Sequence, residues 1–322
     1  MAFRENQPTL GSERAILYSP QPASRNTCHG HHRPKYGREH DVRQQENARS
    51  GQMNVGTNTS FRRSALIAAV KVAKCLRPQR GNVLFLTSKL CVKYGRLVQL
   101  SEAFALQFIA THTSIPVPKL HCAFVHHGCT YILMDRIKGD MLVRGWASRT
   151  EESKAKIFGQ LRKMVDEMRK LPAPGHCVSN VVGGSLYDSR FAGTSSTIGP
   201  FDTIQDFHLF LRNGLKEPPE NYPEVGDMMR LQDQPWPMPV FTHADLSSFN
   251  ILVRGDDVVG IIDWETAGWY PIYWEYTMAC LEANPMNMWW KEEADHFLDP
   301  MQQDVEMEAL RLKYFGRFPW FQ

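Results

Sequence analysis

The sequence lacks a long apolar run, a cysteine framework and an apolar leader. The best candidate for a membrane-spanning helix, residues 64–76, is interrupted by Lys71 and Lys74, whereas such a helix needs about 18 or more apolar residues in succession. The seven cysteines are odd in number and show no framework spacing, which indicates reduced thiols in a reducing compartment. The N-terminal residues lack the core of a secretory signal. We therefore expect a cytoplasmic protein without a membrane partner.

An excess of one charge sign is also missing. With 37 basic and 34 acidic residues the net charge is +3, too small to indicate a polyanionic partner. Glycine and proline, 22 and 20 residues of 322, are too few for a collagen-like or low-complexity chain. The 43% of hydrophobic and 22% of charged residues are typical of globular proteins, and the length favours one large domain or two modest lobes.

The first sixty or so residues differ in composition from the rest. Residues 1–62 contain few aliphatic side chains and many Asn, Gln, Ser, Arg and Gly. They cannot bury enough apolar surface to fold, so we predict a disordered N-terminal tail. Acidic residues are mixed among its arginines, which argues against nucleic-acid binding. One group in the tail offers metal ligands, but in a flexible tail such a group is more often incidental. It consists of Cys28, His29, His31 and His32.

Residues 63–136 are predicted to form a small mixed unit with an antiparallel sheet. Apolar spacing predicts helices over residues 64–76 and 101–113, the second with Ser101 as its N-cap. Apolar runs separated by turn residues predict two hairpins. Their strands are residues 82–86 with 89–95, joined at Thr87-Ser88, and 118–125 with 129–135, joined at 126–128.

The rest of the chain, residues 137–322, has a mainly helical pattern. Helical periodicity predicts three helices, with two further helical segments after Pro271. These helices cover residues 151–171, 202–211 and 222–231. Short strands are predicted over residues 239–242, 250–253 and 258–262. The predicted fold class is therefore α+β.

One segment, HADLSSFNILVRGDDVVGIIDW from His243 to Trp264, contains the residues suited to chemistry. A strand leads into His243 and Asp245, and the short hairpin that follows begins at Asn250 and ends on Asp263. Such a hairpin brings the two carboxylates and the amide to the same edge. Oxygen ligands of this kind suit a hard cation such as Mg²⁺, and a carboxylate that does not bind the metal can orient or deprotonate a hydroxyl.

This segment resembles the catalytic loop and metal-binding hairpin of the aminoglycoside phosphotransferase and choline-kinase-like family, which is related to the protein kinases. HADLSSFN matches the family pattern His-x-Asp-x-x-x-x-Asn, and IIDWE matches Ile-Asp-Trp/Phe. The flanking text IIDWETAGWYPIYWEYT is similar to the branch common in filamentous fungi. The resemblance covers about residues 64–300. It implies a two-lobed protein-kinase-like fold, with a nucleotide-binding N-lobe over 63–136 and a larger, mainly helical C-lobe over 137–322.

The resemblance also implies roles for residues of the segment. Asp245 is expected to act as the catalytic base or to orient the acceptor hydroxyl, and Asn250 and Asp263 are expected to bind Mg²⁺. His243 is expected to brace the loop. The implied activity is transfer of the γ-phosphoryl group of ATP to a hydroxyl of a small molecule.

Lys93 and Glu102 acquire a nucleotide-binding role from this resemblance. Lys93 lies in a predicted strand among apolar neighbours, and a buried ammonium needs a partner, for which Glu102 in the next helix is available. In the family, such a lysine binds the α- and β-phosphates while a helix glutamate holds it. Without the downstream motif, a solvated lysine and a glutamate favoured by the helix dipole would be the simpler interpretation.

The resemblance makes residues 134–137 the linker between the lobes. Main-chain groups of Asp135 and Ile137 are expected to pair with the adenine edge, with Met134 behind the pocket. The covering hairpin has no G-x-G-x-x-G pattern, and Ser88 at its tip is the candidate for a phosphate contact.

A His/Cys cluster between residues 121 and 129 suggests zinc, but the period of a strand argues against it. His121 and Cys122 are adjacent, so they point to opposite faces and cannot readily share one ion. A plain hairpin is the favoured interpretation.

Two acidic or aromatic groups near the C-terminal end each allow two interpretations. Trp289-Trp290 and the acidic residues at 292, 293 and 295 either line the acceptor pocket, through cation–π and ion-pair contacts, or form one amphipathic helix. Glu265 and Glu275 either brace the loop by a structural salt bridge, which is favoured, or contact substrate.

The sequence therefore predicts a phosphotransferase with ATP and a small hydroxylated acceptor as partners and Mg²⁺ as cofactor. The acceptor is open among aminoglycosides, choline-like amines, sugars, homoserine-like amino acids and protein hydroxyls, because variable helices build that pocket. The alternative is a pseudokinase that serves as a binding module. Against it, the chain contains all of Lys93, Glu102, Asp245, Asn250 and Asp263.

Overall fold

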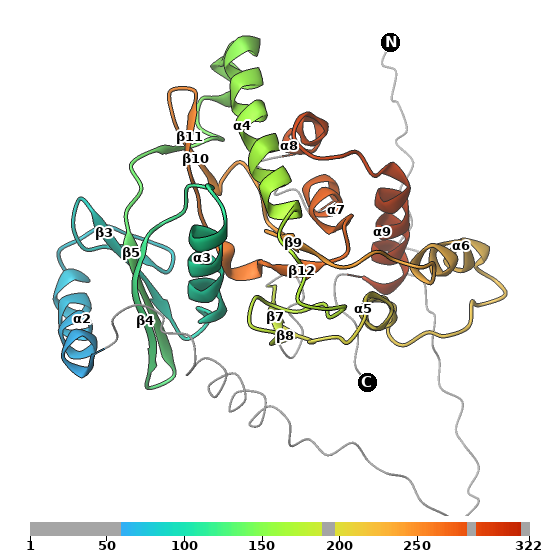
Figure 1. The fold of residues 1–322 in the computed structure, drawn as a ribbon, viewed down its shortest axis with the longest axis horizontal. Helices are drawn as coiled ribbons and strands as arrows, with labels where there is room; N and C mark the ends of the chain where they lie inside the picture. The colour runs from blue at the N-terminus through green and yellow to red at the C-terminus, as the bar shows by residue number, and fades with distance from the viewer. Residues whose placement is uncertain (1–58, 189–196, 282–287, 317–322) are drawn as a thin grey trace, which may run out of the picture. The chain divides into compact units, whose positions relative to one another are not determined.

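A five-stranded antiparallel sheet forms the N-terminal part of the computed structural model, which describes residues 59–188, 197–281 and 288–316 (Figure 1). Its strand order is β1-β2-β3-β5-β4. The strands are β1 (Gln79–Arg80), β2 (Val83–Phe85), β3 (Leu90–Gly95), β4 (Leu120–His126) and β5 (Cys129–Asp135). Both hairpins predicted for this part of the chain are present. The predicted tail, up to residue 58, and its His/Cys group lie outside the described residues.

Turn chemistry explains how both hairpins reverse direction. Thr87 Oγ1 accepts hydrogen bonds from the main-chain N–H groups of Lys89 (3.1 Å) and Leu90 (2.9 Å) and so closes the turn between β2 and β3. His127 and Gly128 have φ angles of 48° and 69°, which a two-residue turn needs if its twist is to match the strands it joins.

Two helices cover opposite faces of this sheet (Figure 1). α2 (Ser60–Ala73) buries Leu66 and Val70 in one apolar cluster, and α3 (Ser101–His112) buries Ile109 in another. Because alternate side chains of a strand point to opposite faces, the sheet supplies both clusters. The helix α3 contains Glu102, one of the candidate site residues.

α2 begins earlier than the apolar spacing predicted. The hydroxyl of Thr59 accepts a hydrogen bond from the main-chain N–H of Arg62 (3.3 Å) and caps the first turn. The predicted boundary between tail and lobe, at residue 62, therefore falls inside this helix.

The predicted N-cap of α3 is wrong. The N-cap is Leu100, and no side chain caps this helix. The chain already turns before Ser101, because the carbonyl of Gln99 accepts a hydrogen bond from the N–H of Glu102 (3.3 Å). Ser101 is therefore the first helical residue.

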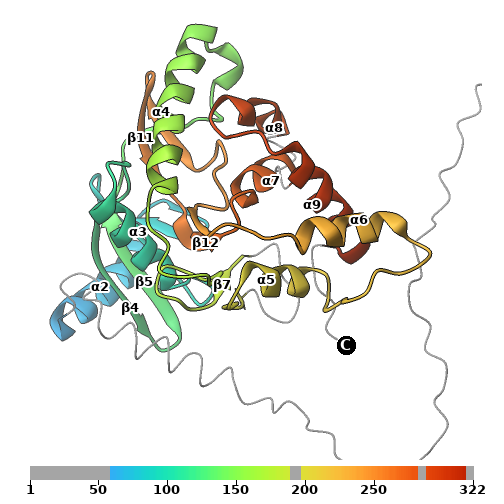
Figure 2. The ribbon, with the colours of Figure 1, turned by 45° about the vertical axis from the view of Figure 1, so that its right-hand side comes forward.

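The described residues after this sheet contain six α-helices, which Figure 2 shows from a second side. They are α4 (Glu151–Arg169), α5 (Ile204–Leu211), α6 (Pro223–Gln232), α7 (Trp274–Leu281), α8 (Trp290–Glu293) and α9 (Gln302–Phe315). Thr150 caps α4, whose inner face buries Ile157 and Leu161. In the described part of the chain, three α-helices rather than two follow Pro271. None of the helices described is both long enough and apolar enough to cross a bilayer.

Small sheets connect these helices. β10 (Ile251–Arg254) pairs with β11 (Asp257–Ile261) and with β6 (Asp140–Met141), and β9 (Val240–Thr242) pairs with β12 (Gly268–Tyr270). The hairpin predicted after Asn250 is therefore present. The pair β7 (Leu186–Tyr187) and β8 (Thr197–Ile198) was not predicted, because it lies in a stretch rich in glycine and serine.

A third apolar cluster, around α5, has a buried histidine beside it. His208 is 0% exposed, and its Nδ1 and Nε2 lie 2.8 Å from the carbonyl of Gln232 and the hydroxyl of Tyr273. A neutral ring satisfies both contacts, with Nδ1–H donating to the carbonyl and Nε2 accepting from the hydroxyl. Burial lowers the pKa of His208 to about 4.

Candidate active site

Lys93 lies at the centre of three carboxylates. It occupies β3, the middle strand of the five-stranded sheet, and its side chain is 8% exposed. Its Nζ lies 2.7 Å from Glu102 Oε2, and the other two contacts are 2.6 Å to Asp263 Oδ1 and 2.9 Å to Glu265 Oε2. The pairing of Lys93 with Glu102 is present in the structure. The salt bridge favoured for Glu265 is made with this same lysine.

The cluster has an excess of negative charge, because one ammonium faces three carboxylates. Burial raises the pKa of Glu102 to about 7, although Lys93 acts to lower it. Burial acts to lower the pKa of Lys93, but the carboxylates outweigh it and hold that pKa above its ordinary value. One ligand atom each from Glu102, Asp263 and Glu265 lie within 4.8 Å of one another, a spacing that suits a divalent cation.

A buried carboxylate holds the entry of the loop over residues 243–250, which follows β9. We call this loop the candidate catalytic loop. Glu275 of α7 is 1% exposed, and its Oε2 accepts hydrogen bonds from the main-chain N–H groups of His243 (2.7 Å) and Ala244 (3.2 Å). Ala244 has a φ of 64°, in the left-handed region that is costly for a residue other than glycine. Glu275 therefore braces a strained loop.

His243 connects the loop to the strand that leads to Asp263. Its Nδ1 accepts a hydrogen bond from the main-chain N–H of Asp245 (3.2 Å), and its Nε2 lies 3.1 Å from the carbonyl of Ile262. A neutral imidazole with its proton on Nε2 satisfies both contacts, since the carbonyl can only accept. This is the position in which a loop-bracing histidine was expected.

Asn250 orients Asp245 and is hydrogen-bonded to the chain just before Asp263. Its Nδ2 donates to Asp245 Oδ2 and to the Asp245 carbonyl, both at 2.9 Å. The main-chain N–H of Ile262 donates to the Asn250 carbonyl (2.9 Å). The structure therefore brings together the three residues that the motif predicted to converge, with Asp263 following Ile262.

Asp263 and Asn250 fit the role of Mg²⁺ ligands. Asp263 has a φ of 66° and a ψ of 56°, and it contacts Lys93 through Oδ1 while its side chain is 40% exposed. Because the Nδ2 of Asn250 is committed to Asp245, its Oδ1 is the atom left to face a cation. Hard oxygen donors beside excess negative charge are what Mg²⁺ prefers.

The linker residues lie where β5 leaves the sheet. Met134 is 7% exposed and belongs to the apolar cluster under α3, and the Asp135 carbonyl lies 3.7 Å from Cys91 Sγ. Ile137 is half-buried, and its N–H donates no hydrogen bond within the part of the chain described. Ser88 is exposed in the turn between β2 and β3. The register of β3 and β5 places Met134 opposite Cys91 and Asp135 opposite Leu90, on the strand that contains Lys93.

Trp290 supports the candidate catalytic loop, which the sequence did not reveal. It is 1% exposed, and its Nε1 donates to the carbonyl of Leu246 (3.0 Å). Trp289 instead stacks on Trp146, with ring centroids 5.3 Å apart, and the Nε1 of Trp146 donates to Glu293 (3.1 Å). The sequence does not show this contact, because Trp290 and Leu246 lie 44 residues apart.

The residues of the suspected zinc cluster serve different contacts. His121 Nε2 lies 2.7 Å from Asp135 Oδ1, whereas Cys122 is 3% exposed in the apolar cluster beneath α2. His121 and Cys122 therefore have different surroundings, as expected for adjacent residues of a strand.

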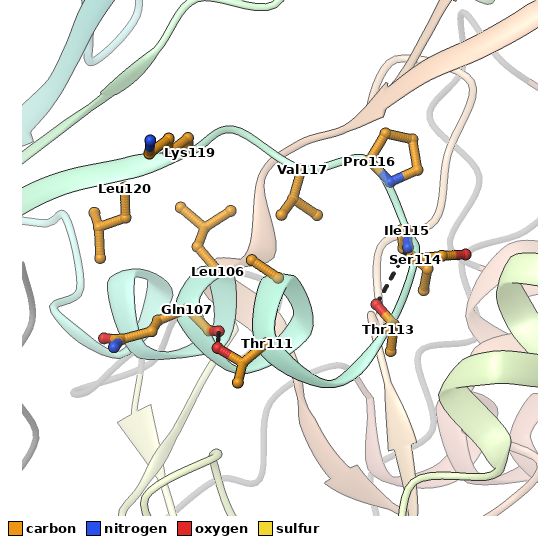
Figure 3. A pocket seen from close by; sticks show the side chains of 11 residues that line it. Leu106, Gln107, Thr111, Thr113, Ser114, Ile115, Pro116, Val117, Lys119 and Leu120 are labelled. Carbon is orange, nitrogen blue, oxygen red and sulfur yellow. Dashed lines mark hydrogen bonds between the residues drawn. The ribbon is translucent and has the colours of Figure 1, made fainter.

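A pocket of about 430 Å³ lies between α3 and the segment that leads to β4 (Figure 3). At its rim, Ser114 donates through its N–H and hydroxyl to Glu167 (2.7 and 2.6 Å). Its lining contains none of the residues predicted to bind nucleotide, metal or acceptor, so we do not assign those ligands to it. The lining residues are Leu106, Gln107, Ala110, Thr111, Thr113, Ser114, Ile115, Pro116, Val117, Lys119 and Leu120.

Solved structures of aminoglycoside phosphotransferases resemble this structure. The gentamicin–APH(2")-IIa complex is 12% identical with a TM-score of 0.50, and the similarity covers 80% of this chain and 87% of that one. APH(4)-Ia is also 12% identical with a TM-score of 0.50, over 79% of this chain and 88% of the other. At these identities the likeness shows the fold, which is protein-kinase-like.

Comparison with protein families assigns the chain more directly than these structures do. No curated protein sequence matches it. The model of the phosphotransferase enzyme family matches residues 98–312, which is more than half of the 322 residues. This range includes the candidate catalytic loop and the hairpin that ends on Asp263. The chain therefore belongs to the phosphotransferase enzyme family.

Proposed function

We propose that this protein is an ATP- and Mg²⁺-dependent phosphotransferase that moves the γ-phosphoryl group of ATP to a hydroxyl of a small molecule. The observation that supports it best is the contact of Lys93 with both Glu102 and Asp263, beside a loop in which Asn250 orients Asp245. These residues are the parts that phosphoryl transfer requires, namely a phosphate-binding cation, metal ligands and an oriented carboxylate. Membership of a phosphotransferase family agrees with it.

Nucleotide binding is assigned to the N-terminal sheet and the linker. Lys93 binds the α- and β-phosphates, and Glu102 holds its ammonium in place. To do so, Lys93 exchanges its contact with Asp263 for phosphate oxygens. The adenine edge pairs with the main chain of Asp135 and Ile137, in front of Met134. The exposed hydroxyl of Ser88 offers a further phosphate contact, so we include it in the proposed site.

Asp263 and Asn250 are the residues that would hold Mg²⁺. When bound there, Mg²⁺ neutralises charge on the phosphates. Glu265 lies within reach of the same position, so it contributes negative charge whether or not it becomes a ligand. The three carboxyl groups that face the single ammonium of Lys93 leave an excess of negative charge there, which supports this assignment.

Asp245 acts on the acceptor hydroxyl. The hydroxyl oxygen bonds to the γ-phosphorus while its proton passes to Asp245, and the bond from the γ-phosphorus to the bridging oxygen of the β-phosphate breaks, which releases ADP. Asn250 contributes by fixing Asp245 Oδ2 at 2.9 Å, and His243 fixes the loop main chain at Asp245 (3.2 Å). Catalysis rests on positioning and charge neutralisation.

The acceptor is proposed to be a small hydroxylated compound in the cytoplasm. The names of two structural neighbours include aminoglycoside phosphotransferase or gentamicin, so aminoglycosides are the first class to test, followed by choline-like amines, sugars and homoserine. The six described cysteines are all free thiols, which agrees with a reducing compartment.

The experiment is transfer of label from [γ-³²P]ATP to this panel of acceptors in the presence of Mg²⁺. Asp245→Asn should lower kcat by about 10²- to 10⁴-fold, because the variant cannot accept the proton. Asp257→Asn is the matched control, since Asp257 is an exposed carboxylate on the same hairpin and should transfer at the rate of the parent. Equal turnover of parent and Asp245→Asn would refute the assigned role. Tight MgATP binding without transfer to any hydroxyl compound would favour the pseudokinase.

A further inference from the structure

α2 has a second apolar face that nothing in the described part of the chain covers. Its inner face places Leu66 and Val70 against the sheet, where they are 6% and 3% exposed. On the outer side, Phe61, Val72 and Leu76 are 82%, 63% and 74% exposed. Large apolar side chains at that exposure, gathered on one element, usually mark an interaction surface.

These side chains form a continuous stripe. At about 100° per residue, Phe61 and Val72 fall about 20° apart on α2, and the exposed Ala65 and Ala68 lie beside them. The exposed Leu76 follows in the turn after the helix ends at Ala73. The helical part of the stripe runs over about 17 Å at 1.5 Å per residue from residue 61 to residue 72. We call these five residues the outer stripe of α2.

Basic residues border the outer stripe. By the same geometry, Arg62 and Lys71 fall on its two sides, and Arg77 and Arg80 follow its C-terminal end. Two further cations, one in α2 and one at its C-cap, lie over aromatic rings of the sheet instead. These are Arg63, 5.6 Å from the Phe124 ring centroid, and Lys74, 5.0 Å from that of Tyr94.

The segment that contains α2 has no acidic residue at all. Residues 59–101 include nine lysines and arginines and no Asp or Glu, the first acid being Glu102. The near-neutral total charge of the chain, +3, therefore conceals a strongly basic stretch. Of the nine, only Lys93 is committed to the carboxylate cluster of the active site.

Charge selects among the possible occupants of the outer stripe. A second copy of this chain would bring like charges together around the stripe, which is unfavourable. Residues 1–58 contain eight basic and five acidic residues, so they are not complementary either. Nucleic acid would meet the basic residues but not the apolar stripe. An anionic lipid surface satisfies both, since apolar side chains enter the interface while cations meet headgroups.

We propose that the outer face of α2 binds anionic lipid bilayers, with Phe61, Val72 and Leu76 entering the interface and Lys71, Arg77 and Arg80 contacting headgroups. Such a contact needs no membrane-spanning helix. It departs from the expectation of a protein without a membrane partner, because that expectation considered only long apolar runs. It also lies on the opposite face of the sheet from α3, so it leaves the proposed catalytic residues untouched.

The test is sedimentation of the full chain with large unilamellar vesicles of phosphatidylcholine and phosphatidylserine (7:3), compared with phosphatidylcholine alone. We expect binding to the mixed vesicles, weaker binding in 0.5 M NaCl because salt screens exposed charges, and little binding to phosphatidylcholine. Lys71→Gln/Arg77→Gln should weaken binding by about 25-fold, at about fivefold for each cation near an anionic surface. Phe61→Ser/Val72→Ser/Leu76→Ser should weaken it by at least about tenfold.

Matched controls use residues of the same type away from α2. Met238→Ser/Met288→Ser replaces side chains that are 40% and 57% exposed, and Lys156→Gln/Arg230→Gln removes two cations with side chains 57% and 78% exposed. Both controls should bind vesicles as the parent does. Because all of these side chains are exposed, urea unfolding of every variant should match the parent within about 0.5 kcal/mol.

Three results would overturn the proposal. The first is no binding to the mixed vesicles at 0.1 M salt. The second is binding that the serine variant of the outer stripe leaves unchanged, because the stripe would then have no part in it. The third is a lipid-free dimer in sedimentation velocity that this serine variant converts to a monomer, which would assign the stripe to a second copy.

Discussion

Replacement of Glu275 by alanine should destabilise the protein and impair the candidate catalytic loop together. The variant leaves the main-chain N–H groups of His243 and Ala244 without the oxygen that accepts both, at 2.7 and 3.2 Å. Each buried donor left without a partner costs about 1–3 kcal/mol, so the free energy of unfolding should fall by about 2–6 kcal/mol. Relaxation of the strained Ala244, which has a φ of 64°, reduces this loss by about 1 kcal/mol or more.

That relaxation has a second consequence, because Asp245 follows Ala244 directly. If Ala244 returns to an ordinary conformation, Asp245 moves relative to Asn250, and a displacement of about 1 Å can lower turnover by about 10²-fold. Glu275→Gln keeps one oxygen for both N–H groups and nearly the same volume. It should therefore lose only the benefit of the charge, about 1–2 kcal/mol.

Urea unfolding followed by tryptophan fluorescence measures the first effect. Glu306→Ala is the matched control, because Glu306 is exposed on α9 and its loss should change stability by less than about 0.5 kcal/mol. The predicted order of stability is parent and Glu306→Ala first, then Glu275→Gln, then Glu275→Ala. Equal stability of Glu275→Ala and Glu306→Ala would show that the buried carboxylate does not hold the loop.

Further predictions concern the active site, pH and packing. Asp245→Asn should bind MgATP with the affinity of the parent in calorimetry while turnover falls, and a tenfold weaker affinity would contradict a role in the transfer step alone. The pKa of His208, about 4 in the fold against about 6.5 when unfolded, means that the unfolded chain binds the extra proton first. Stability should therefore fall by about 3 kcal/mol from pH 7 to pH 4, and His208→Gln should lose correspondingly less on acidification. Gly268→Ala should cost about 1–3 kcal/mol, because its new Cβ would lie 2.6 Å from the Ser179 carbonyl oxygen. Gly159→Ala, where nothing lies within 4 Å, should instead stabilise α4 by about 0.5–1 kcal/mol.

Local patterns explain why much of the fold was predictable. The two hairpins of the N-terminal sheet could be predicted from apolar runs and from turn residues such as Gly128, whose positive φ the turn requires. The pair β7 and β8 was missed because its strands are two residues each, too short to show alternation. The N-cap of α3 was missed because the turn at Gln99 is made by main-chain hydrogen bonds, which leave no mark in the sequence.

At the candidate site, contacts between residues close in the sequence were predictable, whereas contacts between distant residues were not. Asp245, Asn250 and Asp263 lie within one hairpin, so their spacing was enough to predict that they converge. Glu275 was recognised only as a brace or a substrate contact, because its partners lie some 31 residues away and depend on how α7 packs. The second and third carboxylates on Lys93 depend likewise on tertiary structure, since they lie 170 and 172 residues along the chain.

The sequence did not reveal the exposed apolar face of α2, because apolar residues at helical spacing can lie on two opposite faces of one helix. Leu66 and Val70 satisfied the pattern of a helix packed on a sheet, and the same window also contains Phe61 and Val72 on the outside. Which of two apolar faces is buried is decided by the sheet, so only the structure distinguishes them.

The most direct test of the proposed nucleotide site is thermal unfolding of the purified chain with ATP, with and without Mg²⁺. A ligand at a hundred times its dissociation constant adds about 2.7 kcal/mol of stability, which corresponds to a rise in Tm of about 5 °C or more in a protein of this size. We expect this rise to require Mg²⁺ and to disappear in Asp263→Ala, while Asp257→Ala responds as the parent does. An unchanged Tm in a parent protein that unfolds cooperatively, or a full response in Asp263→Ala, would contradict a Mg²⁺–ATP site built on Lys93, Asn250 and Asp263.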